Sequence, residues 1–286
     1  MFGLSLVSTL DYPINNMYKS NIVLDDSSLV DLLDTYRLLG PDILLSHATN
    51  LTPSDIQKLN KAKAWISTTP NTELQMGHGP IVCFQKDCFD ISSLGIDCHS
   101  NNSGDMVSQM RLALQHERSC RNDVLLAEGK IPLSLNLSVQ DVFRLGTIQG
   151  ARAIHMEDRL GSIEVGKLAD LVIFDGNSPG MVCAAEQDPV AAIVFHSSVR
   201  DIDTVIVNGQ IRKQDGKLLP VAIKPSLPEV AIRPQKMEWN QIAQELLSSR
   251  RRIEEAMAKA NANEPERLVK AFMKLACLDE SRFVRL

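Results

Sequence analysis

Three short apolar runs, separated by stretches with helical patterns, constrain the fold of this chain more than any other feature. They are "DILLSH" (42–47), "AWIST" (64–68) and "SSLGID" (92–97), and we predict that the third strand ends at Asp97. Short, continuous apolar runs suit strands of a parallel sheet that is covered on both faces. Strands that alternate with helices are typical of βαβ units. The chain is therefore predicted to have an α/β fold built on a parallel sheet.

Helix start signals support this alternation. Thr52 can cap the helix after the first strand, with Pro53 at its first position and Asp55 three residues after the cap. Ser138 repeats the signal farther along the chain, with Asp141 three residues after it. Each signal satisfies backbone N–H groups at the start of a helix. We therefore expect helices to begin at both places.

Glycine and proline mark two further segments. The stretch "TPNTELQMGHGP" (69–80) contains two of each and predicts a turn-rich loop. Gly146 and Gly150 lie on one side of a predicted helical segment. Small residues there indicate close packing against another element.

The pattern changes after residue 157 and predicts three parts. Residues 1–159 hold the strand and helix alternation, residues 160–219 are rich in β pattern, and residues 220–286 are a proline-rich linker with C-terminal helices. In the second part "VNGQI" indicates a hairpin, because Asn-Gly favours the tight turn between two strands. From Met237 onward an apolar stripe predicts one helix, and a second is expected from near Pro265. These helices could cover the sheet or mediate self-association into a homo-oligomer.

Composition excludes several classes of partner. The net charge of −5 and the pI of about 5.7 give no electrostatic reason to expect nucleic acid or an anionic membrane as a partner. No apolar run approaches the ~20 residues of a membrane span. The first residues lack the basic region and cleavage site of a signal peptide. The six cysteines are scattered, which favours reduced thiols and a cytoplasmic location.

Ionisable residues occur at the predicted carboxyl ends of the strands. His47 ends the first run and Asp97 ends the third, and in an α/β fold reacting groups lie just past such strand ends. His78 in the glycine-rich segment and His99 just beyond Asp97 are candidates to bind a substrate. The alternatives remain open: His47 can be a hydrogen-bonded structural residue, and Asp97 can cap the next helix.

Several motifs occur in an order that resembles a known family. They are "LLSHATNLTPSDIQKL", "TPNTELQMGHG", "GIDCHSNNSGDM", "GTIQGARAIHMEDRLGSIEVGKLADLVIFD" and "VNGQI". Together they resemble the C-terminal part of the amidohydrolase superfamily, in particular its cytosine deaminase-like and chlorohydrolase-like group. The resemblance covers about residues 40–219. It implies the last strands of a TIM-like (β/α) barrel, a small β-sandwich-type domain and a bound zinc or iron ion.

The resemblance also implies roles for individual residues. Asp97 resembles the aspartate that ligates the metal in this family and moves the proton of the attacking water. His47 resembles the sixth-strand histidine, which contacts the substrate or orients that water. Many relatives carry His-x-Pro-x-Ser-Asn in the next loop, whereas this chain reads Thr-Thr-Pro-Asn-Thr-Glu over residues 68–73. The histidine of that motif is therefore replaced by Thr68.

Two metal-binding patterns of the family do not occur in this sequence. No two histidines are separated by one residue, and no histidine is followed three residues later by glutamate. We expect the chain to be truncated at its N-terminus relative to the family. The resemblance implies a metal-dependent hydrolase of non-peptide C–N bonds, of deaminase or chlorohydrolase type, with an aminated or halogenated heterocycle as substrate. The alternative is an inactive remnant that acts as a binding or assembly subunit.

Overall fold

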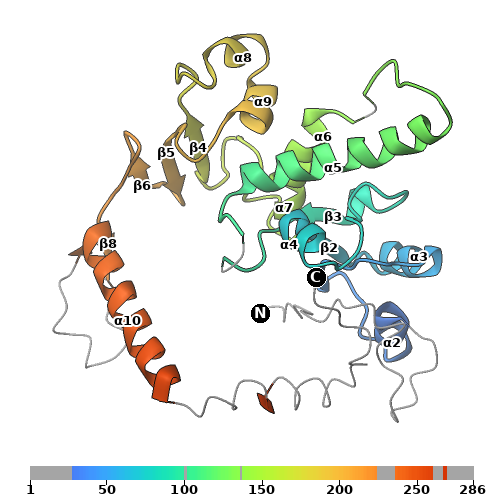
Figure 1. Cartoon of the computed structure of the whole chain (residues 1–286), viewed down its shortest axis with the longest axis horizontal. Coiled ribbons are helices and arrows are strands. Elements are labelled where there is room, and N and C mark those ends of the chain that lie inside the picture. The colour runs from blue at the N-terminus through green and yellow to red at the C-terminus, as the bar shows by residue number, and fades with distance from the viewer. Residues whose placement is uncertain (1–27, 100–101, 136, 224–235, 260–266, 269–286) are drawn as a thin grey trace.

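The structure is a computed structural model of the whole chain. It describes residues 28–99, 102–135, 137–223, 236–259 and 267–268 (Figure 1).

The first part of the chain forms a three-stranded parallel sheet. Its strands are β1 (Leu44–Ser46), β2 (Trp65–Thr68) and β3 (Ser92–Leu94), in the order β1-β2-β3. This confirms the predicted α/β class and the parallel pairing of these strands. Because neighbouring strands are parallel, their carboxyl ends meet at one edge of the sheet.

One helix precedes the first strand, and the others follow the strands along the chain. They are α2 (Leu29–Thr35), α3 (Pro53–Ala62), α4 (Pro70–Gln75), α5 (Met106–Ala127), α6 (Val139–Leu145) and α7 (Ile148–Ala153), and a 3₁₀ turn, η1 (Phe89–Ile91), leads into β3. The predicted caps are confirmed, since Thr52 and Ser138 each form a capping box with the aspartate three residues later.

The prediction of a loop over residues 69–80 is wrong in its first half, which forms helix α4. Pro70 occupies the first helical position, where its missing N–H costs nothing. The Thr69 N–H donates to Oε1 of Glu73 at 2.7 Å, which satisfies a backbone donor at the start of the helix. Glycine and proline therefore mark the ends of this element, not an absence of helix.

The apolar core consists of two clusters. One lies where α5 and α6 pack near β3, and the other lies under α2, α3, β1 and β2. A Cβ at Gly146 would lie 2.9 Å from Sδ of Met110, which confirms close packing at that glycine. Gly150 has open space within 4 Å of such a Cβ, so the same prediction is wrong there.

A second sheet is antiparallel. Its strands are β4 (Leu171–Phe174), β5 (Ile202–Val207), β6 (Gln210–Gln214) and β7 (Lys217–Leu218). Asn208 and Gly209 both have positive φ, 49° and 73°, which confirms the predicted tight hairpin between β5 and β6. The described residues of this part form one sheet, so a β-sandwich stays a prediction, as do the domain boundaries.

The helical segments between β4 and β5 pack against helices α5 and α6 of the first part. They are α8 (Val182–Gln187), α9 (Pro189–Ala191) and the π-helical turn η2 (Ala192–His196). Arg111 on α5 donates to the carbonyl oxygens of Val194 at 2.8 Å and Ser197 at 2.6 Å. This side chain therefore ties α5 to the segment that leads into β5.

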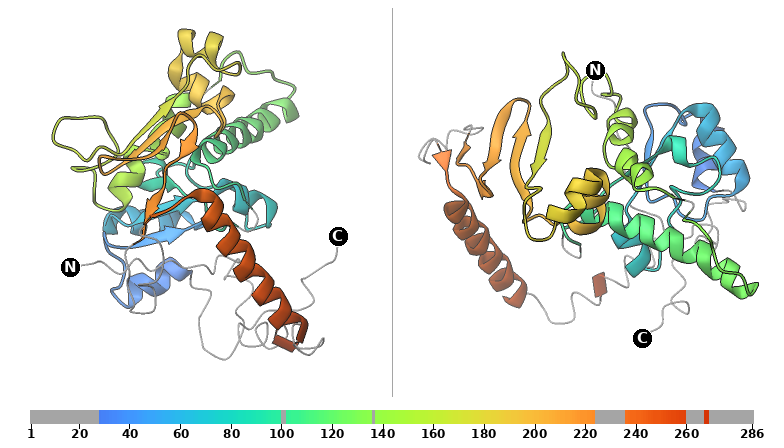
Figure 2. Two further views of the ribbon diagram at one scale, coloured as in Figure 1. Left: turned by 90° about the vertical axis from the view of Figure 1, so that its left-hand side faces the viewer. Right: turned by 90° about the horizontal axis from the view of Figure 1, so that it is seen from above.

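The last described helix, α10 (Trp239–Lys259), follows a short pair of strands, β8 (Val221–Ala222) and β9 (Lys236–Met237). It extends away from both sheets in the views of Figures 1 and 2. It has no buried residue, and its apolar stripe is exposed at Trp239, Leu246, Leu247, Ile253 and Met257. The helix expected from near Pro265 falls largely outside the described residues. None of the described helices has the length and apolar character that crossing a bilayer requires.

Candidate active site

His47 follows directly after β1, at the edge of the sheet where the carboxyl ends of the strands meet. Its backbone is left-handed, with φ 62°, a conformation that costs energy for residues other than glycine. The His47 N–H still donates to the Ser67 carbonyl of β2 at 2.9 Å. The chain therefore turns sharply at His47 while staying attached to the sheet, and the residue is only 3% exposed.

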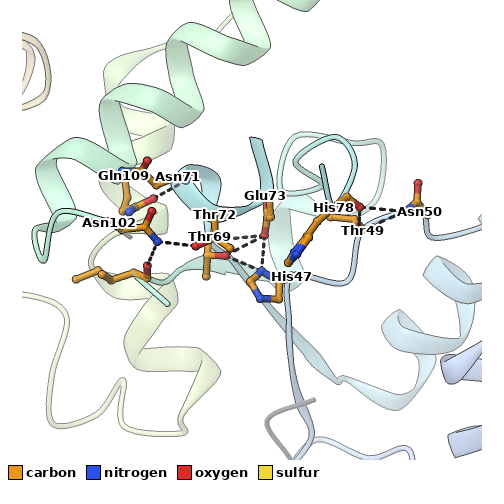
Figure 3. A network of polar contacts seen from close by, with 11 residues as sticks. His47, Thr49, Asn50, Thr69, Asn71, Thr72, Glu73, His78, Asn102 and Gln109 are labelled. Carbon is orange, nitrogen blue, oxygen red and sulfur yellow. Dashed lines mark hydrogen bonds and ion pairs between the residues drawn. The ribbon is translucent and has the colours of Figure 1, made fainter. Parts of the chain in front are cut away.

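The His47 ring contacts a hydroxyl and a carboxylate from the start of α4 (Figure 3). Its Nδ1 lies 2.6 Å from Oγ1 of Thr69 and 3.4 Å from Oε1 of Glu73. The same Oε1 accepts the Thr69 N–H at 2.7 Å and lies 3.4 Å from the Thr69 hydroxyl. Thr69 thus bridges the imidazole and the carboxylate.

Glu73 is fully buried, which is rare for a carboxylate. Burial raises its pKa above the usual value, and the hydrogen bonds from His47 and Thr69 act in the opposite direction. Its second oxygen, Oε2, has no hydrogen-bond partner in the described part of the chain. Holding this carboxylate in its buried position therefore costs free energy, and such a cost is typical of functional sites.

His78 packs against His47. The two ring centroids lie 5.1 Å apart and the rings are nearly perpendicular. The His78 carbonyl accepts the Thr49 hydroxyl at 2.5 Å and the Asn50 amide at 3.2 Å, which holds this residue near the turn after β1. Burial lowers the pKa of His78, the charge of His47 lowers it further, and the Asp97 carboxylate opposes both.

The prediction that the third strand runs to Asp97 is wrong, because β3 ends at Leu94. Gly95 continues beside β2: its N–H donates to Thr68 O at 2.8 Å, and a Cβ there would lie 2.5 Å from Oγ of Ser67. Asp97 follows with φ 64° and an exposed side chain.

Asp97 does not cap the following helix. That position belongs to Asp105, whose carboxylate accepts the Ser108 N–H at 2.7 Å. His99 is exposed, and its ring lies against Gly104, where a Cβ would be 2.9 Å from Nδ1. The structure therefore brings the buried His47 and the half-buried His78 together, and the charge of Asp97 acts on His78, whereas His99 is exposed and stands outside this pair.

A second polar network fixes α4. Asn102 donates to the Thr72 hydroxyl at 2.5 Å and accepts from the Gln75 amide at 2.6 Å. The Asn71 N–H donates to the buried Gln109 side chain on α5 at 3.1 Å. These contacts attach α4 to the loop after β3 and to α5.

Sequence reasoning did not identify Thr69 or Glu73 as site residues. The available signal was the first-turn glutamate after a proline, which marks a helix start. It does not show that the carboxylate would be buried.

The described residues do not fit a metal ion on their own. No three His, Cys, Asp or Glu side chains in the described ranges lie close enough together to hold one. A zinc site takes three protein ligands plus water at a catalytic centre, and the family pattern identifies Asp97 alone here. His47 is engaged with Thr69 and Glu73 through Nδ1.

Comparison with known proteins agrees with the motif order. The model of the amidohydrolase family matches residues 16–212. A 5′-deoxyadenosine deaminase from Methanosphaera stadtmanae is 27% identical over 234 residues, which is 81% of this chain and 51% of that protein. A 5-methylthioadenosine/S-adenosylhomocysteine deaminase from Pyrococcus abyssi is 30% identical over 68% of this chain and 43% of that protein. The chain thus spans about half the length of these curated relatives or less.

Solved structures show the same likeness. An adenosine deaminase from Xanthomonas campestris with bound zinc superposes with a TM-score of 0.55 and 26% identity, over 66% of this chain and 40% of that one. An atrazine chlorohydrolase from Arthrobacter aurescens, also in complex with zinc, gives a TM-score of 0.55 at 22% identity, over 65% of this chain and 39% of that one, and supports the fold alone. With a family match over residues 16–212, this chain belongs to the amidohydrolase family.

Proposed function

We propose that this chain contributes the histidine and aspartate side of a hydrolase site that breaks a C–N bond in an aminated heterocycle. The observation that carries the proposal is the pairing of buried His47 with half-buried His78 at the carboxyl edge of the parallel sheet, with the charge of Asp97 acting on His78. Family membership and the deaminase names of the relatives support the reaction class.

In this proposal Asp97 takes a proton from the attacking water and passes it to the leaving nitrogen. An exposed carboxylate whose charge acts on His78 suits that exchange, because it can reach both water and substrate. His47 orients the water or the substituent on the electrophilic carbon. His78 borders the same edge and contributes to binding. His99 contributes only if the substrate extends over the start of α5.

A zinc or iron ion supplies activated water in the family chemistry. Since the described residues do not fit such an ion, we assign no step to it here. The ligands beyond Asp97 would have to come from groups other than the clustered side chains of the described residues.

The proposed substrate is an aminated purine nucleoside or a related heterocycle. This choice follows the names of the relatives, which act on 5′-deoxyadenosine, 5-methylthioadenosine or S-adenosylhomocysteine. A halogenated heterocycle is the second choice, because the sequence motifs also resemble the chlorohydrolase-like group.

The incomplete donor set favours a second candidate function, that of an inactive subunit which binds the heterocycle without hydrolysing it. Both candidates use the same edge of the sheet. They differ in whether the purified chain turns substrate over.

Metal analysis combined with two ligand assays separates the candidates. Purified chain would be incubated with zinc or iron(II), and ammonia release from 5′-deoxyadenosine and 5′-methylthioadenosine would be followed, with binding measured by calorimetry. Stoichiometric metal and ammonia release support the hydrolase. Saturable binding without metal or ammonia supports the binding subunit. If the chain neither binds nor hydrolyses these nucleosides, that result would contradict both candidate functions.

A further inference from the structure

The buried contact between α4 and His47 decides which ring nitrogen of His47 carries a proton. Oγ1 of Thr69 is nearer to Nδ1, at 2.6 Å, than Oε1 of Glu73, at 3.4 Å. The hydroxyl is therefore the direct partner of the ring. A hydroxyl has one proton to donate, so it can donate either to Nδ1 or to Glu73.

The buried carboxylate selects between these two arrangements. Oε1 already accepts the Thr69 N–H at 2.7 Å, and the hydroxyl lies on the same side at 3.4 Å. Hydrogen bonds to an ionised acceptor are stronger than neutral ones, and a buried carboxylate without donors is costly. The hydroxyl proton then goes to Glu73, and the hydroxyl oxygen accepts a proton from Nδ1.

Protonation of Glu73 does not reverse this choice. Burial favours the neutral acid, and Oε2 is the oxygen without a hydrogen-bond partner among the described residues. A proton on Oε2 leaves Oε1 a carbonyl-type acceptor for both Thr69 donors. The hydroxyl therefore points the same way in either charge state.

We propose that Glu73, acting through Thr69, is a positioning residue that holds neutral His47 as the Nδ1–H tautomer. Nε2 of the neutral ring is then a hydrogen-bond acceptor, so His47 receives a proton from water or substrate instead of donating one. This role rests on the proposed function for its meaning in catalysis. The tautomer itself is a property of the folded chain and is measured without turnover.

The test is the ¹⁵N spectrum of the histidine rings in the full chain, recorded at a pH high enough for the ring ¹⁵N shifts of His47 to show the neutral form. His47 is assigned by the signal that His47→Gln removes. The wild type should show the Nδ1–H tautomer. Glu73→Met removes the acceptor at similar length, so the Thr69 hydroxyl should turn to donate to Nδ1. The ratio of Nδ1–H to Nε2–H should fall by about tenfold or more.

Glu73→Gln is the conservative variant, because its amide oxygen can accept both Thr69 donors, and it should keep the wild-type tautomer. Glu186→Met changes an exposed glutamate on α8 and should leave the His47 signal unchanged. Amide spectra confirm that each variant is folded. The proposal is overturned if His47 of the wild type is in the Nε2–H form, and this result does not depend on whether Glu73→Met folds. It is also overturned if a folded Glu73→Met keeps the Nδ1–H form. If the tautomers behave as expected but no nucleoside is bound or hydrolysed, the positioning role stands and the proposed function fails.

Discussion

Nδ1 of His47 and Oε1 of Glu73 lie 3.4 Å apart with both side chains almost fully buried. Because burial raises the pKa of Glu73, the folded chain holds its proton to higher pH than the unfolded chain does. The free energy of unfolding should therefore fall as pH rises above the ordinary glutamate value of 4.5 and through the folded pKa.

In Glu73→Gln the free energy of unfolding should not show this decrease with pH, because the glutamine amide does not ionise. The variant should gain stability relative to the wild type between a pH of about 4 and a pH of about 8, measured by urea unfolding at several pH values. Glu186→Gln, which changes an exposed carboxylate, should run parallel to the wild type. A stability difference for Glu73→Gln that does not grow with pH would contradict the cost assigned to the buried carboxylate.

Gly95 should tolerate no side chain. A Cβ there would lie 2.5 Å from Oγ of Ser67 and 3.2 Å from Cγ2 of Thr69, so these packed side chains must shift. Gly95→Ala is expected to cost about 1–3 kcal/mol in urea unfolding. Gly150→Ala is the matched control: it lies in α7 with open space around it, and should be neutral or stabilising by up to about 1 kcal/mol. Equal effects at the two glycines would contradict the close approach at Gly95.

Arg111 should be a main attachment between α5 and the segment before β5. Arg111→Met keeps the apolar stem but leaves the Val194 and Ser197 carbonyls without their guanidinium donor, at about 1–3 kcal/mol for a buried group left unsatisfied. Hydrogen exchange should rise over residues 192–201. The control Arg121→Met breaks a surface ion pair with Glu117 and should cost less than about 1 kcal/mol. Unchanged exchange in Arg111→Met would show that other contacts hold the segment.

The exposed stripe of α10 keeps self-association as a prediction, with a second copy of the helix as its partner. Trp239, Ile242, Leu246 and Ile253 recur at heptad spacing. In a parallel pair, Glu245 of one copy would face Arg250 of the other, which is a complementary arrangement.

Leu246→Lys should therefore lower the mass measured by sedimentation equilibrium from dimer to monomer. Glu255→Lys lies off the stripe and should leave the mass unchanged. If the wild-type chain is monomeric at high concentration, a second copy of the chain does not cover the stripe and the prediction is wrong.

Local signals predicted the elements well where the physics is local. Thr52 and Ser138 cap their helices because a side-chain oxygen next to free N–H groups acts in any context. The Asn208-Gly209 turn forms for a similar reason, since its positive φ angles suit those two residues.

The parts that depend on tertiary contacts could not be predicted in the same way. The loop assigned to residues 69–80 contains a helix whose first turn is stabilised by Glu73 and by contacts with Gln109. The strand predicted to end at Asp97 ends at Leu94, because its register partner Thr68 is the last residue of β2. Nothing local signals that Glu73 is buried, since charged residues are almost never fully buried unless they are paired.

The central claim is that Asp97 performs proton transfer at this edge of the sheet. The most direct measurement is ammonia release from 5′-deoxyadenosine by the metal-supplemented chain, compared among wild type, Asp97→Ala and the control Asp123→Asn, an exposed aspartate on α5. We expect Asp97→Ala to lower the rate by about 10²-fold or more and Asp123→Asn to leave it unchanged. A rate that Asp97→Ala does not alter would contradict the account.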